Sequence, residues 1–249
     1  MTISWVVFAC TCAGAVLGMS LRRILPEHHI NEDSKDFVKL GMGLIATMAA
    51  LVLALLITSA KSYHDLQNTE VTELASDFIL LDRTLALYGP ETADARSQIP
   101  ATINNVIDQT WSKDAFRSEN LDHAFGPRAE MFYAQIRQLV PRTDFQRAIY
   151  AQLLEIGMEL RRKRSFLLEQ TGGSIPTPFL VVLAFWLALI FAGFGLFAPT
   201  NSTVIGIMVA CTLSVAAAIF LILELDHPFQ GLMQISSASL RDALVHLGK

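Results

Sequence analysis

Four long apolar runs divide the chain, and polar segments separate them. Each run has about 20 residues, which is the length that an α-helix needs to cross the hydrocarbon core of a bilayer. A cleaved signal peptide does not fit the first run, because its apolar stretch is too long and no basic residue precedes it. The runs are therefore predicted to be membrane-spanning helices: Ile3–Leu21, Leu40–Ala60, Phe179–Ala198 and Thr203–Leu223.

The apolar pattern continues beyond the second run at helical spacing. Apolar residues recur there in steps of three and four, which marks one buried face of a helix, and Gly89-Pro90 ends the pattern. The same spacing traced backward reaches the second run, so we predict one helix over residues 38–88. In its soluble part the seam consists of Val71, Leu74, Phe78, Leu81, Leu85 and Tyr88. In its membrane part the seam includes Gly43, Ala46 and Ala50, small residues that are expected to pack against other helices.

The rest of the segment between the second and third runs is also helical in pattern. A helix is predicted over residues 92–111, where Pro100 indicates a kink or a late start. A short helix follows up to Val140-Pro141. Thr143 and Gln146 form a capping box for a long helix that ends before Gly172-Gly173. The predicted buried face of that long helix is Phe145, Ile149, Leu153, Ile156, Leu160 and Leu167.

These patterns define an all-α fold class. The chain is predicted to be a four-helix transmembrane protein with a helical-bundle soluble domain inserted between the second and third membrane helices. The second membrane helix is continuous with that domain. The predicted domains are residues 1–60 (two membrane helices and their loop), 61–178 (soluble), 179–225 (two membrane helices) and 226–249 (C-terminal tail).

Two stripes of small residues in the membrane runs predict helix association. One is Gly14-x-x-x-Gly18 in the first run. The other steps by four residues along the fourth run and consists of Gly206, Ala210, Ser214 and Ala218.

Composition supports a membrane protein and excludes several other classes. The chain is 52% hydrophobic and 17% charged, with a formal net charge of −4, and it has no basic stripe interleaved with aromatic residues. We therefore expect no nucleic-acid partner. The three cysteines lie inside membrane runs without metal or disulfide spacing, so they are interpreted as small packing residues, and no cofactor is expected. Basic residues near the membrane ends favour a cytoplasmic soluble domain by six to four, although Arg22-Arg23 after the first run argues the reverse.

Polar groups that carry chemistry are scarce. No ionisable residue lies inside the four runs away from their ends, which argues against a proton-coupled or ion-coupled transporter. His28 and His29 lie in an acidic loop, but adjacent histidines rarely bind one ion, so a hydrated loop is favoured and no metal site is predicted. The basic cluster Arg161–Arg164 is expected to contact anionic lipid headgroups and carboxylates of neighbouring helices.

One face of the second helix is a candidate pore wall. It lies opposite the predicted seam and turns polar beyond the membrane, at Thr69, Glu73 and Asp77. Several copies around an axis would form an apolar constriction that opens into a polar vestibule, and such a constriction gates by dewetting. Lipid contact explains the membrane portion equally well. The candidate pore-lining residues are Leu44, Met48, Leu51, Leu55, Ser59 and Ser62.

Three stretches, Gly41–Ala46, Ile79–Pro90 and Leu223–Gly231, resemble the bacterial bestrophin-like domain family of integral membrane proteins. The resemblance covers nearly the whole chain and extends more remotely to bestrophins. It implies a pentameric anion channel with four membrane helices per subunit, a helical cytosolic part and a pore lined by the second helix. Animal bestrophins have a calcium-binding acidic run after their Pro-Phe, whereas here Gln230–Ser237 contains no acidic residue. No calcium site is therefore carried over, and the stretch after the fourth run is interpreted as a structural turn formed by Asp226, Pro228, Phe229 and Gly231.

The sequence alone leaves three functions to be compared. The leading one is a homo-oligomeric ion channel or pore of the bacterial plasma membrane, whose partners are the bilayer, ions and copies of itself. The alternative is a non-conducting membrane scaffold or sensor that binds a partner through its soluble domain. A membrane enzyme would have only Glu224, Asp226, His227 and the His28-His29 loop as polar candidates. We therefore expect no catalytic residues and no enzyme.

Overall fold

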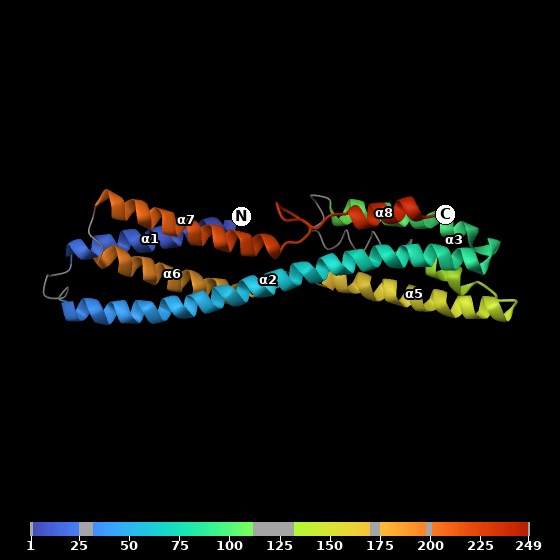
Figure 1. Ribbon diagram of the computed structural model, residues 1–249, viewed down its shortest axis with the longest axis horizontal. Helices are drawn as coiled ribbons and strands as arrows, with labels where there is room; N and C mark the ends of the chain where they lie inside the picture. Colours follow the sequence, from blue (N-terminus) through green and yellow to red (C-terminus); the bar gives the residue numbers. More distant parts are fainter. Residues whose placement is uncertain (1, 25–31, 112–131, 170–174, 198–200, 249) are drawn as a thin grey trace. The chain divides into compact units, whose positions relative to one another are not determined.

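The computed structural model describes residues 2–24, 32–111, 132–169, 175–197 and 201–248. Helices account for nearly all of this part of the chain, and no strand occurs in the described ranges (Figure 1). The all-α prediction is therefore confirmed. Four of these helices have the length and apolar composition to cross a membrane.

The membrane-length helices begin and end close to the predicted runs. They are α1 (Thr2–Ile24), α2 (Glu32–Tyr88), α6 (Thr177–Phe197) and α7 (Ser202–Leu225). α2 is one helix of 57 residues, so the predicted continuity past the second run is confirmed. Its start precedes the predicted residue 38, because residues 32–37 lack apolar periodicity but contain no glycine or proline that would end a helix.

The chain divides into two compact units, each of which combines distant segments. Unit 1 consists of Met1–Tyr63 and Ser174–Asp226, and unit 2 consists of His64–Gly173 and His227–Lys249. α2 contributes its first part to unit 1 and its second part to unit 2. The domain boundaries predicted from the sequence remain a proposal beside this division.

In unit 1, α1 packs against both α6 and α7. Glycines bring α1 and α6 into close contact, because a Cβ at Gly14 or Gly18 would overlap the carbonyl oxygen of Ala188 or Ala192. The predicted packing role of the first small-residue stripe is confirmed. The stripe on α7 is different: Gly206, Ala210 and Ser214 are exposed, and a Cβ at Gly206 would meet nothing within 4 Å. Only Ala218, at the end of that stripe, is half-buried within the chain.

Unit 2 contains the second part of α2, η2 (Pro90–Thr92), α3 (Ala93–Thr110), helical residues 132–137, α5 (Asp144–Glu169) and α8 (Ala238–His246). All six predicted seam residues of α2 from Val71 to Tyr88 are buried in its core. α3 continues through Pro100 and contributes Ile99, Ile103 and Val106 to the same core. On α5, Ile149, Leu153, Ile156 and Leu160 are buried as predicted.

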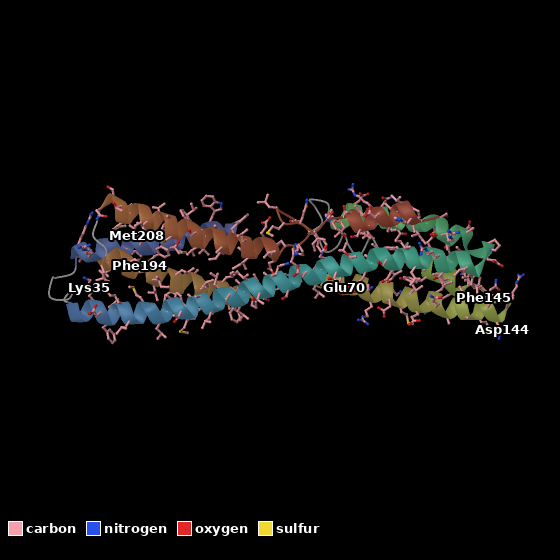
Figure 2. All side chains as sticks on the ribbon, viewed as in Figure 1. Lys35, Glu70, Asp144, Phe145, Phe194 and Met208 are labelled. Carbon is pink, nitrogen blue, oxygen red and sulfur yellow. The ribbon has the colours of Figure 1, made fainter. Side chains whose placement is uncertain are left out.

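Phe145 is an exception to the predicted face of α5. It is 59% exposed and lies in the first turn of that helix, next to Asp144 (Figure 2). The apolar face predicted for α5 therefore starts one turn too early. The first turn extends past the core, which begins at Ile149.

Side-chain caps explain where α2 ends and α5 begins. Gly89 has φ of 136°, a backbone conformation that favours glycine, and Pro90 follows it. The Thr92 hydroxyl hydrogen-bonds to the Leu85 carbonyl at 2.6 Å, and Gln146 Nε2 donates to the Tyr88 carbonyl at 3.2 Å. Gln146 also donates its backbone N–H to Thr143 Oγ1 at 3.1 Å, as the predicted capping box requires.

Candidate functional site on the second helix

The buried side of α2 in unit 1 differs from the predicted seam. Ala49, Leu56 and Ala60 are buried, and Ile45 and Val52 are partly buried against the same core. Its partners are residues of α6 and α7, including Leu183, Ile190, Ile219 and Ile222. Met42 belongs to this side as well, because its side chain occupies the space beside Gly193 of α6.

Within one chain, Gly43, Ala46 and Ala50 do not pack against another helix as predicted. All three are exposed, and a Cβ at Gly43 would have no neighbour within 4 Å. Most of the buried or partly buried residues lie one position before a predicted seam residue, as Ile45 does before Ala46 and Ala49 before Ala50. The second run is apolar on every side, so its periodicity contains little contrast from which the buried face can be read.

All six candidate pore-lining residues lie on exposed parts of α2. Leu44 is 64% exposed, Leu51 is 72% and Leu55 is 61%, which are high values for leucine in a packed protein. Met48 is less exposed, at 43%. The remaining two, Ser59 and Ser62, are also exposed. Within one chain these side chains have no buried role, so their surroundings in an assembly decide what they do.

Two acidic residues in the polar continuation of α2 form ion pairs with α5. Lys163 of α5 is 2.7 Å from Asp77 Oδ2 and 3.0 Å from Glu73 Oε2. Burial alone would lower the pKa of Lys163, but its hydrogen bonds to Asp77 and Glu73 and their charges hold the pKa above its usual range. Glu73 and Asp77 therefore link α2 to α5 rather than forming an unpaired acidic wall. Thr69 remains exposed.

The rest of the basic cluster is partly paired. The Arg161 guanidinium lies 4.4 Å from the centroid of the Tyr133 ring, a cation–π contact. Arg162 is 82% exposed, and its Nη1 is 3.8 Å from Glu159 Oε1. Pairing with carboxylates of a neighbouring helix, which the sequence predicted, is confirmed for Lys163, whereas Arg162 pairs within its own helix. Contact with lipid headgroups stays a prediction, and the Arg164 side chain lies outside the described part.

An ion pair in unit 2 between buried Asp82 and half-buried Arg96 was not recognised from the sequence. Asp82 on α2 receives two hydrogen bonds from Arg96 on α3, at 2.8 and 3.1 Å, and one from the Gly248 backbone N–H at 3.1 Å. Burial alone would raise the pKa of Asp82, but these hydrogen bonds and the charges of Arg96 and Arg83 hold it below its usual range. The sequence signal that could have revealed this pair is Asp82 itself, an acidic residue directly after Leu81 of the apolar seam.

The residues after α7 form a compact turn. In unit 2, the Ile235 backbone N–H donates to the Pro228 carbonyl at 2.7 Å, and Gly231 has φ of 88°. The Phe229 ring stacks edge-on against Trp111, with centroids 5.5 Å apart, and Trp111 Nε1 donates to the Ile235 carbonyl at 2.7 Å. In unit 1, Asp226 is buried at the end of α7. These contacts support a structural role for the four predicted residues, which we retain as a proposal.

The other polar candidates form no site among the described residues. His28 and His29 lie outside the described residues. Of the second set, Glu224 is half-buried, Asp226 is buried and His227 is exposed. Within the described ranges, no group of three or more histidine, cysteine, aspartate or glutamate residues is arranged to hold a metal ion.

Comparison with known proteins finds solved structures and a family that this chain resembles over nearly its whole length. Two crystal structures of a bacterial bestrophin homologue from Klebsiella pneumoniae, each with a single substitution, have this fold. One matches with a TM-score of 0.59 and 14% identity over 97% of this chain and 98% of the homologue. The other has a TM-score of 0.57 and 14% identity over 95% and 97%. No curated protein matches the sequence. The family model for the bestrophin-like domain matches residues 9–240, and the chain therefore belongs to the bestrophin-like domain family.

Proposed function

We propose that this chain is one subunit of a homo-oligomeric ion channel, with the exposed side of α2 around the central axis. The observation that carries the proposal is the contrast between helices of unit 1. In the most apolar stretch of α2, only 11% of the residues are buried within the chain, whereas 33% are buried in the corresponding stretch of α6. The helix with the least cover in its own subunit is the one that an assembly would have to surround.

The chemistry of the exposed side fits a gated pore. Leu44, Leu51 and Leu55 would narrow the path to an apolar constriction, which blocks ions by excluding water until it widens. Ser59 follows at the end of the run, and Ser62 lies just beyond it. A ring of copies joined head to tail closes such a path, and the bestrophin relationship favours five copies and anions as the permeating species.

The membrane placement is part of the same proposal. The bacterial plasma membrane would surround unit 1, and the soluble domain would face the cytoplasm, where basic residues near membrane ends are enriched. No catalytic step is part of the proposal.

Purified protein in a planar bilayer tests conduction directly. We expect an anion current in the wild type. Leu51→Thr should raise the open probability or the conductance several-fold, because a hydroxyl at the constriction makes dewetting less favourable. The matched control is Val181→Thr on α6, which adds the same hydroxyl at a side chain that is 62% exposed and should leave the current unchanged. Correctly assembled protein that passes no current would contradict the proposal.

The alternative, a scaffold that binds a partner through its soluble unit, has one observation in its favour. Leu80 and Leu87 of α2 are 43% and 59% exposed in unit 2, where water is the solvent. Crosslinking in native membranes separates the two functions. A closed ring supports the channel, whereas a monomer, or a dimer joined only through unit 2, supports the scaffold.

A further inference from the structure

The threonines away from the helix starts in unit 1 differ in exposure from helix to helix, although exposed serines occur on α1 and α7 as well, at Ser20 and Ser214. Thr11 of α1 and Thr212 of α7 are 0% and 2% exposed, and each donates to a carbonyl four residues earlier in its own helix. The described residues of α6 include no serine or threonine beyond Thr177 at its start. On α2, by contrast, Thr47 and Thr58 are both exposed within the apolar run.

Helix geometry places these two threonines on the most outward line of α2. Successive residues turn by about 100°, so Thr58, nine residues after Ala49, is about 180° around the helix from it. By the same count Thr47 and Leu51 are each within about 20° of that direction. Ala49 is 5% exposed and lies at the middle of the buried side, while Leu51 is 72% exposed. Met48 and Ser59 lie farther round, on one flank.

A surface hollow ends at the first of these threonines. It is open, has a volume of about 670 Å³, and is lined by Asp36, Lys39, Leu40, Gly43 and Thr47. Asp36 and Lys39 form an exposed ion pair at 3.0 Å near the start of α2. These described lining residues lie along one side of α2, from the Asp36–Lys39 pair to Thr47 within the apolar run.

We propose that the hydroxyls of Thr47 and Thr58 line the conduction path on either side of Leu51, as the groups that keep water in contact with the wall. This inference rests on the proposed channel function and deepens it. It assigns a pore-lining role to two residues that were not among the candidates, Thr47 and Thr58. The side of α2 that faces the path is then the outward line and not the flank that carries Met48 and Ser59.

The hydrogen bonds of the two threonines define what they can bind. Thr47 Oγ1 donates to the Leu44 carbonyl at 2.7 Å, and Thr58 Oγ1 donates to the Ala54 carbonyl at 2.9 Å. Each oxygen keeps acceptor capacity on its outward side, which suits a water molecule. A bare anion would need the hydroxyl proton to leave the carbonyl. The occupant of these positions is therefore the hydration water of an ion and not a dehydrated anion.

Cysteine accessibility tests the assignment without requiring current. In a background where Cys10, Cys12 and Cys211 are replaced by alanine, Thr47→Cys and Thr58→Cys are treated with a charged, membrane-impermeant thiol reagent in native membranes. We expect both to react. Ala46→Cys and Ile57→Cys are matched controls, because each lies one residue away at nearly the same depth, is exposed in the chain and points to the other flank. They should react much more slowly.

Currents test the role of the hydroxyl itself. Thr47→Val and Thr58→Val keep the shape of the side chain but remove its polar atom, and each should lower the conductance about five-fold, the effect of one ordinary hydrogen bond. Thr47→Ser and Thr58→Ser should restore it. Thr11→Val and Thr212→Val make the same change at buried positions and should leave the conductance as in the wild type.

The outcomes separate the two proposals. Labelling at Met48→Cys and Ser59→Cys but not at Thr47→Cys and Thr58→Cys overturns the inference and leaves the channel standing. A silent wild type overturns the channel function, while the labelling pattern still decides which side of α2 faces water. Valine variants with wild-type conductance overturn the hydration role.

Discussion

The two parts of α2 belong to one helix but are packed by different rules. In unit 2, every residue of the predicted seam from Val71 to Tyr88 is buried. In unit 1, the seam continued by the same arithmetic is exposed at Gly43, Ala46 and Ala50, and the buried side lies about one residue earlier. In water, an apolar side chain must be buried, so its position reveals the packed face. In lipid it need not be, and the pattern loses that meaning.

One substitution in each part of α2 tests most directly whether the two parts are packed differently. Leu85 is fully buried in unit 2, so Leu85→Ala should lower the free energy of unfolding by about 2 to 5 kcal/mol. Leu51→Ala, at a side chain that is 72% exposed in unit 1, should change it by about 0.5 kcal/mol or less. Denaturant unfolding in detergent measures both. Equal losses would show that the two parts are packed alike.

Glycine substitutions compare a packed and an exposed helix surface inside unit 1. Gly18→Ala would place a methyl group against the Ala192 carbonyl and should cost about 1 to 3 kcal/mol, as overpacking does. Gly43→Ala meets open space and should be neutral or stabilise the helix by about 0.5 kcal/mol, because alanine is the better helix former. Thermal unfolding in detergent checks the order. A larger loss at Gly43 would mean that a neighbouring subunit covers that flank.

The smallest expected effect concerns charge. The pKa of Asp82 is lowered in the folded state, so the carboxylate stabilises the fold above its ordinary pKa of about 3.9 and loses that contribution as the pH falls through the lowered value. Asp82→Asn should therefore cost about 1 to 2 kcal/mol at neutral pH and progressively less below about pH 4. Unfolding midpoints measured across this range test it.

The exposed pair of unit 1 supplies the control for that measurement. Asp36 and Lys39 are 68% and 52% exposed, and an exposed pair of this kind contributes at most about 1 kcal/mol. Asp36→Asn should therefore have a smaller effect than Asp82→Asn at neutral pH. A pH-independent difference between wild type and Asp82→Asn would contradict the assignment of the ion pair.

The exposed leucines of the candidate site were expected from the sequence, but the most outward side of α2 was not, and the pore-lining role stays a proposal. The exposure of Leu44, Leu51 and Leu55 is as expected for a face that has no partner in its own chain. The outward position of Thr47 and Thr58 was not predicted, because it depends on where α6 and α7 cover α2. In the polar stretch expected to form a vestibule, Glu73 and Asp77 are paired with Lys163, which lies 86 residues beyond Asp77 in sequence. No local pattern reports such a pairing.

The sequence by itself determined the elements whose cause is local. Run length specifies four membrane helices, apolar spacing specifies the buried face between Val71 and Tyr88, and Gly89-Pro90 ends α2. Only the tertiary structure decided which side of α2 is covered in unit 1, and which carboxylates are paired with Arg96 and Lys163. The reason is physical. A helix apolar on every side has no intrinsic inner face, and a buried charge is stabilised only by partners that folding brings together.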